Sequence, residues 1–111
     1  MRSATTIYAG ALVLLTILIG TGSAQAWDRQ VKQGESLART NCARCHAVGR
    51  VGTSPLPAAP PFRELHKRYP VEDLGEALTE GIRTDHPSMP EFRFDPDQAQ
   101  DLIAYMKSLE R

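Results

Sequence analysis

A run of five residues, Cys42-Ala43-Arg44-Cys45-His46, constrains this chain more than any other feature. Two thiols separated by two residues lie about one turn apart at a helix end or in a tight loop. At this spacing each thiol can add across one vinyl group of a haem, and the adjacent His46 is placed to bind the iron. The C-x-x-C-H run therefore predicts covalent haem attachment through Cys42 and Cys45.

Two cysteines at this spacing also occur in zinc sites, thioredoxin-like redox motifs and disulfides. The chain contains 2 cysteines, so a zinc site would need further ligands of another type. A thioredoxin-like motif would need an α/β pattern, and no run of alternating strand residues is visible. These alternatives stay open on the cysteines alone, while the trailing His46 favours haem.

Residues 1–26 have the pattern of a secretory signal peptide. Arg2 supplies the positive charge, residues 7–19 are almost entirely apolar, and Ala24-Gln25-Ala26 is a small-x-small cleavage site. The apolar run of 13 residues is short for a membrane-spanning helix, which needs about 20. We expect cleavage after Ala26, with an uncleaved membrane anchor as the alternative.

Residues 27–111 would then form a single domain of 85 residues. A domain of this size is near the limit at which a protein core alone is sufficient, and a buried haem would supply additional apolar surface. This part of the chain has 12 basic and 13 acidic residues, since only Arg2 lies in the leader. The near-neutral balance gives no reason to expect nucleic-acid binding.

Hydrophobic periodicity predicts an all-α fold. The expected helices cover residues 28–41, 62–69, 70–81 and 95–109. Asp95, Pro96 and Gln98 form a capping-box pattern at the start of the last helix. Gly34 is unusual inside the first helix, because glycine costs a helix about 1 kcal/mol, and it suggests close approach by another element.

Two proline-rich segments, residues 47–61 and 83–94, are expected to be loops. The second contains Met89, whose thioether is a soft, neutral ligand that raises the potential of iron when paired with histidine. Met106 lies within the predicted last helix and is interpreted as a core residue. His86, three residues before Met89, could compete for the iron if the loop rearranged.

The chain resembles the class I cytochromes c in its C-x-x-C-H run, its Met89-Pro90-Glu91-Phe92 segment and its C-terminal helix around residues 102–107. The resemblance implies three to four main helices wrapped around one covalently bound haem, with the N- and C-terminal helices crossing. It implies that Gly34, eight residues before Cys42, lies at that crossing against Leu102 or Tyr105.

The same resemblance implies roles for residues in the loops. Met89 would be the sixth iron ligand, opposite His46. The carbonyl of Pro60 would accept a hydrogen bond from the free ring nitrogen of His46 and so raise its donor strength. Many members of the family have a mid-chain tryptophan near a haem propionate, whereas Trp27 is the sole tryptophan here. Arg63 or Arg83 could replace it.

The resemblance implies a periplasmic, monomeric electron carrier that is not an enzyme and exchanges single electrons with redox proteins. A dehydrogenase or reductase would be the donor, and an oxidase or other acceptor would receive the electron. A membrane association would follow only if the leader is retained. The alternatives are a five-coordinate haem protein that binds a small gas or reduces peroxide, and a dedicated subunit of a periplasmic dehydrogenase.

Overall fold

The computed structural model describes residues 22–81 and 88–110. Over these residues the chain forms helices and loops without strands, as the sequence predicts. The elements are α1 (Gly22–Asn41), two 3₁₀ helices η1 (Phe62–Lys67) and η2 (Val71–Asp73), α2 (Leu74–Glu80) and α3 (Pro96–Ser108). None of the helices in these two ranges has the length and apolar character required to span a membrane.

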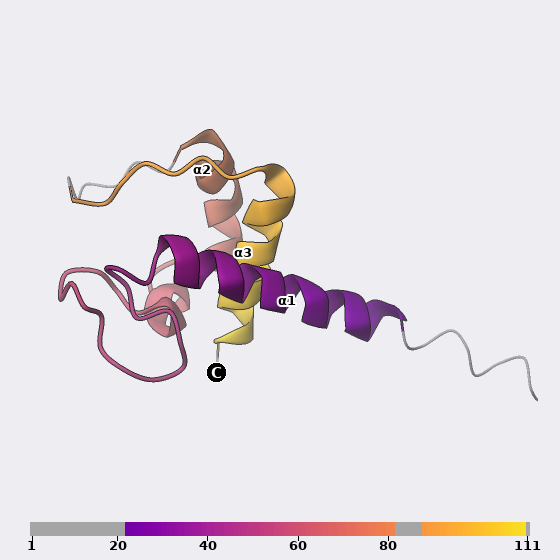
Figure 1. Ribbon diagram of the computed structural model, residues 1–111, viewed down its shortest axis with the longest axis horizontal. Helices are drawn as coiled ribbons and strands as arrows, with labels where there is room; N and C mark the ends of the chain where they lie inside the picture. The colour runs from indigo at the N-terminus through magenta and orange to yellow at the C-terminus, as the bar shows by residue number, and fades with distance from the viewer. Residues whose placement is uncertain (1–21, 82–87, 111) are drawn as a thin grey trace, which may run out of the picture.

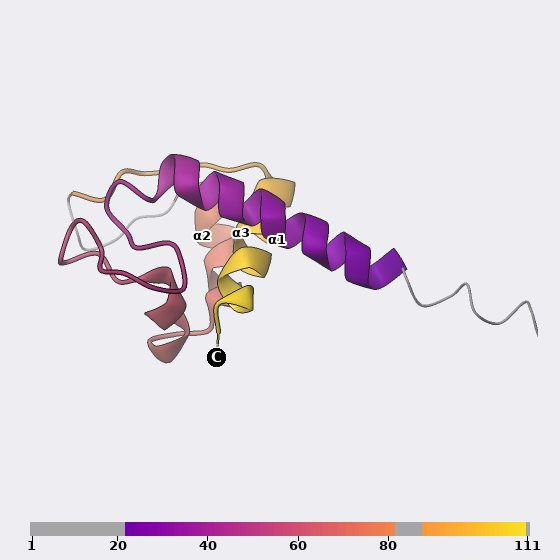
Figure 2. The ribbon, with the colours of Figure 1, turned by 60° about the horizontal axis from the view of Figure 1, so that its bottom comes forward.

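Helices α1 and α3 cross against one another, and this crossing organises the domain (Figure 1, Figure 2). At the contact, Gly34 faces the backbone carbonyl of Asp101 and the Cβ of Tyr105. A methyl group at Gly34 would lie 1.9 Å from the Asp101 oxygen, so only a residue without a side chain fits. The expected crossing is confirmed, and Tyr105 is the side chain that Gly34 meets.

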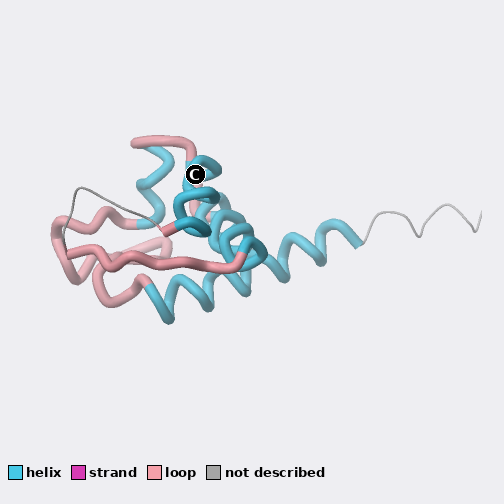
Figure 3. Tube along the Cα trace, turned by 90° about the horizontal axis from the view of Figure 1, so that it is seen from above, coloured by secondary structure: helices cyan, strands magenta, loops and turns pink. Residues whose placement is uncertain are grey.

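The N-terminal part of α1 extends away from the rest of the domain (Figure 3), and its residues 22–30 are exposed. The helix begins six residues earlier than the predicted start at Asp28. The small residues of Ala24-Gln25-Ala26 are compatible with a helix, because alanine has the highest helix propensity. Sequence patterns for a cleavage site and for a helix therefore overlap in this segment.

The shorter elements follow the prolines and glycines of the sequence. The expected helix after Pro61 is a 3₁₀ helix that ends at Lys67, before the predicted limit at Tyr69. Pro70 precedes η2, and α2 ends at Gly81, whose φ of 109° favours glycine. At the start of α3, the Asp95 backbone N–H donates to Oε1 of Gln98 at 3.1 Å, as the capping-box pattern predicts.

The core lies where α3 meets α1, α2 and the two 3₁₀ helices. Tyr105 ties this core to the loop after the C-x-x-C-H run, because its hydroxyl donates to the Val48 carbonyl at 2.5 Å. Helix α3 supplies much of the core and lies between the other helices. The buried core residues are Ala38, Val48, Phe62, Leu65, Val71, Leu78, Ala99, Leu102, Tyr105, Met106 and Leu109.

Candidate cofactor-binding site

The C-x-x-C-H run continues directly from the end of α1. The Cys42 N–H donates to the Ala38 carbonyl at 2.8 Å, and the His46 N–H donates to the Cys42 carbonyl at 3.0 Å. The chain therefore makes one more turn after the helix ends, which places Cys42, Cys45 and His46 close together. The two thiols and the imidazole therefore form one local cluster.

The Cys42 thiol does not have the lowered pKa of a redox nucleophile. Burial raises the pKa of the Cys42 thiol to about 11, whereas reactive thioredoxin-like cysteines have lowered pKa values. Cys42 and Cys45 are both free and partly buried. Within residues 22–81 and 88–110, no group of three or more His, Cys, Asp or Glu side chains is arranged to hold a metal ion.

His46 is held at one ring nitrogen. Its Nδ1 lies 2.7 Å from the carbonyl oxygen of Pro60, and the carbonyl can only accept, so Nδ1 carries the proton. The contact that the family resemblance implies for Pro60 is present. In this tautomer Nε2 is the unprotonated nitrogen and is available as a ligand, and the hydrogen bond increases its basicity.

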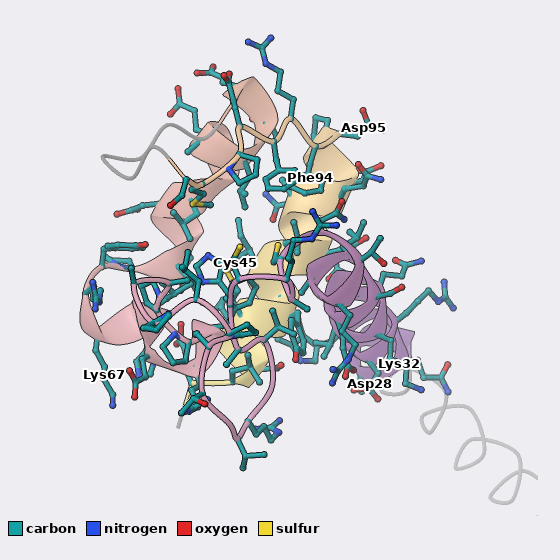
Figure 4. The ribbon with its side chains drawn as sticks, turned by 60° about the vertical axis from the view of Figure 1, so that its left-hand side comes forward. Asp28, Lys32, Cys45, Lys67, Phe94 and Asp95 are labelled. Carbon is teal, nitrogen blue, oxygen red and sulfur yellow. The ribbon has the colours of Figure 1, made fainter. Side chains whose placement is uncertain are left out.

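A cavity of about 800 Å³ lies against this cluster, within the range of about 300–1,000 Å³ found for small-molecule and cofactor sites. Cys42, Cys45, His46, Pro60 and Met89 all line it. The five residues selected from the sequence are separated by up to 47 positions, and the fold brings them to one space. Figure 4 shows the labelled Cys45 near the centre of the molecule and the labelled Phe94 beside the start of α3, and both of these residues line the cavity.

Most of the remaining wall is apolar and comes from several separate elements. Helix α3, the 3₁₀ helix η1, helix α2 and both loops contribute. The apolar side chains that line the cavity include Leu56, Phe62, Leu65, Leu74, Ala77, Leu78, Phe92, Phe94, Leu102 and Met106. An apolar cavity with two thiols at one edge fits a large planar hydrophobic group such as haem.

Two cationic residues that the sequence does not single out lie at the cavity. Arg44 and Arg68 line it, and no Asp or Glu does so among the described residues. Arg63, proposed from the sequence as a propionate partner, lines a separate depression instead, and its Nη2 donates to the Gly52 carbonyl at 2.7 Å. Arg83, the other candidate, lies outside the described residues.

Two thioethers reach the cavity. Met89 lines it from the loop before α3, and Met106, interpreted from the sequence as core, is buried in α3 and lines it as well. The packing of α3 brings Met106 to the cavity. No local sequence signal distinguishes this position from that of an ordinary core residue. His86, the possible competitor, lies outside the described residues.

A small all-α domain with two free thiols, an oriented imidazole and thioethers around one apolar cavity defines a c-type cytochrome. Comparisons with known proteins agree. A family model described as "Cytochrome C oxidase, cbb3-type, subunit III" matches residues 29–106. The chain therefore belongs to this family of cytochrome c domains.

A similar protein is cytochrome c-552 of Bradyrhizobium diazoefficiens. It is 28% identical over 97 residues, which cover 87% of this chain and 91% of the relative. No solved structure matches this chain significantly. The family and the motif together assign haem c, attached covalently through Cys42 and Cys45, as the cofactor of an electron-transfer protein.

Proposed function

We propose that this protein is an exported monohaem carrier that shuttles single electrons between redox proteins, with His46 and Met89 as the axial ligands. The observation that carries the proposal is the meeting of these two side chains at one cavity, although 43 positions separate them. Bound haem supplies the one-electron chemistry. The protein excludes water, orients the imidazole through Pro60 and presents a soft sulfur, which together favour reversible electron exchange.

A carrier of this kind needs no general acid, base or nucleophile, which is why we propose that it is not an enzyme. Its rival is a five-coordinate protein that binds a small gas or reduces peroxide. That function would require the sixth position to be open. The state of Met89 therefore separates the two functions.

The test is CO binding by the reduced holoprotein, with potentiometric titration of the same samples. Met89→Ala should open the sixth position, accelerate CO binding and lower the midpoint potential. Met89→His should keep six ligands and still lower the potential. Met106→Leu is the matched control, because it removes the other thioether at the cavity from a rigid helix while nearly conserving volume.

We expect Met106→Leu to behave like wild type in CO binding. If wild type bound CO as rapidly as Met89→Ala, Met89 would not be a ligand and the gas-binding function would replace the carrier. If Met106→Leu alone accelerated CO binding, the ligand would be assigned to α3 rather than to the loop.

We also propose that the partner surface is acidic where it meets the cavity. The support is the presence of Arg44 and Arg68 among the lining residues, without a lining carboxylate in the described ranges. Electron exchange with an acidic partner should slow as ionic strength rises, because attraction between surface charges is screened. Rates that rise with salt would contradict this choice of partner.

Export to the periplasm is the last part of the proposal. It is supported by the charged, apolar and small-residue segments of positions 1–26. Mass spectrometry of the protein recovered from the periplasm should give a chain that begins at Trp27 and carries one haem. Recovery of the intact leader in the membrane fraction would show an anchored carrier instead.

A further inference from the structure

The His46 imidazole has a second neighbour besides Pro60. The ring of Phe62 lies with its centroid 5.3 Å from the imidazole centroid, at an interplanar angle of 56°. Tilted aromatic pairs at separations of about 4.5–7 Å are attractive, because the edge of one ring meets the electron-rich face of the other. We propose that Phe62 is a positioning residue that sets the plane of the His46 ring, and the inference rests on the proposed role of His46 as ligand.

One hydrogen bond does not fix a ring plane. The bond from Nδ1 to the Pro60 carbonyl, 2.7 Å long, constrains the direction of one nitrogen. The imidazole can still turn about the line that joins these two atoms. A contact away from that line removes this freedom, and the ring of Phe62 supplies it from the same segment of chain.

Backbone hydrogen bonds hold Phe62 next to the segment that carries His46. The Phe62 N–H donates to the carbonyl of Ala47 at 2.9 Å, directly after His46. The Ala47 N–H in turn donates to Oγ of Ser54 at 3.0 Å. The ring of Phe62 is 4% exposed and begins η1, so it has little room to move away.

Pro60 and Phe62 act from one stiff tripeptide. Pro61 lies between them with φ −59° and ψ 141°, and the proline ring restricts φ to about this value. Pro60 is also restricted, because a residue before proline avoids helical conformations. The carbonyl and the aromatic ring are therefore delivered to His46 together, with small loss of chain entropy.

Phe62 also belongs to the core and lines the cavity, so the test must separate orientation from packing. The test uses the oxidised holoprotein. Its electron paramagnetic resonance g values and the NMR shifts of its haem methyl groups depend on the orientation of the axial ligands, including the plane of the imidazole. Phe62→Leu removes the aromatic ring but keeps an apolar side chain, and Phe62→Tyr keeps the ring.

The control is Val71→Ala. Val71 is 1% exposed and part of the same core, but it does not line the cavity. This variant should lower the melting temperature without shifting the g values. We expect Phe62→Leu to shift the g values and the pattern of methyl resonances. We expect Phe62→Tyr to retain the wild-type values of both. If Phe62→Leu fails to incorporate haem, Phe62→Met takes its place.

Unchanged g values in Phe62→Leu would overturn the inference, as would an equal shift in Val71→Ala. A shift in Phe62→Tyr as large as in Phe62→Leu would also overturn it, because the ring would then not be the feature that matters. Failure of the proposed function would be visible in the wild-type protein, because its ferric form would lack the weak red absorption band of sulfur-bound iron. Failure of the Phe62 inference alone would leave that band in place.

Discussion

Replacement of Gly34 with alanine should weaken the domain at the crossing of α1 and α3. The added methyl group would lie 1.9 Å from the oxygen of Asp101, 2.6 Å from its carbonyl carbon and 2.7 Å from Cβ of Tyr105. Favourable contacts between heavy atoms begin at about 3.5–4.0 Å, so the helices would have to separate by about 1.6–2.1 Å. The opposing atoms are backbone and Cβ, which cannot turn away as the end of a long side chain can.

The magnitude follows from two opposing effects. Overpacking of a core costs about 1–3 kcal/mol, and a clash with backbone places this substitution near the upper end. Removal of a glycine from a helix interior contributes about 1 kcal/mol in the other direction. The net loss should be about 2 kcal/mol, which corresponds to a decrease in melting temperature of roughly 8–16 °C for a domain of this size.

The assay is thermal unfolding of the holoprotein, with Gly75→Ala as matched control. Gly75 also faces α3, but a methyl group there would meet Cδ1 of Ile103 at 3.2 Å, and this flexible end can shift. We expect Gly75→Ala to be neutral or slightly stabilising. A Gly34→Ala melting temperature equal to that of wild type or above it would refute a close crossing of the helices.

Three further results are expected. Burial raises the pKa of the Tyr105 hydroxyl above its usual value near 10. The stability that the neutral hydroxyl contributes is therefore complete below that pH and is lost as the pH rises through the raised pKa. Tyr105→Phe should remove this decrease of unfolding free energy at alkaline pH, as measured by denaturant titrations. Gly81→Ala should lower the free energy of unfolding by about 1–3 kcal/mol, because Gly81 has φ 109° and faces the Glu91 carboxylate, and an unchanged denaturation midpoint would contradict this. Arg68→Gln should lower the midpoint potential by tens of millivolts, since it removes a cation from the cavity, whereas Arg63→Gln should change it less.

Local sequence was sufficient for the features that depend on covalent spacing. The attachment of haem through Cys42 and Cys45 follows from neighbouring residues, because the chain can close only one turn between them. The capping box at Asp95 is equally local. Gly34 could be recognised because glycine is costly within a helix, so its presence indicates a close approach. The start of α1 was misplaced because small residues satisfy both a cleavage site and a helix.

The tertiary structure decided which distant groups converge. Arg63 and Arg68 are five residues apart and of the same type, yet only Arg68 lines the cavity, while Arg63 lines a separate depression. Arg63 lies within the 3₁₀ helix η1 and Arg68 follows its end. Met106 has the sequence environment of a core residue, and the position of α3 brings it to the cavity. The contact of Phe62 with His46 requires a loop to return across 16 positions. Periodicity and spacing describe a chain only over a few turns, whereas these contacts depend on how separate segments pack around the same space.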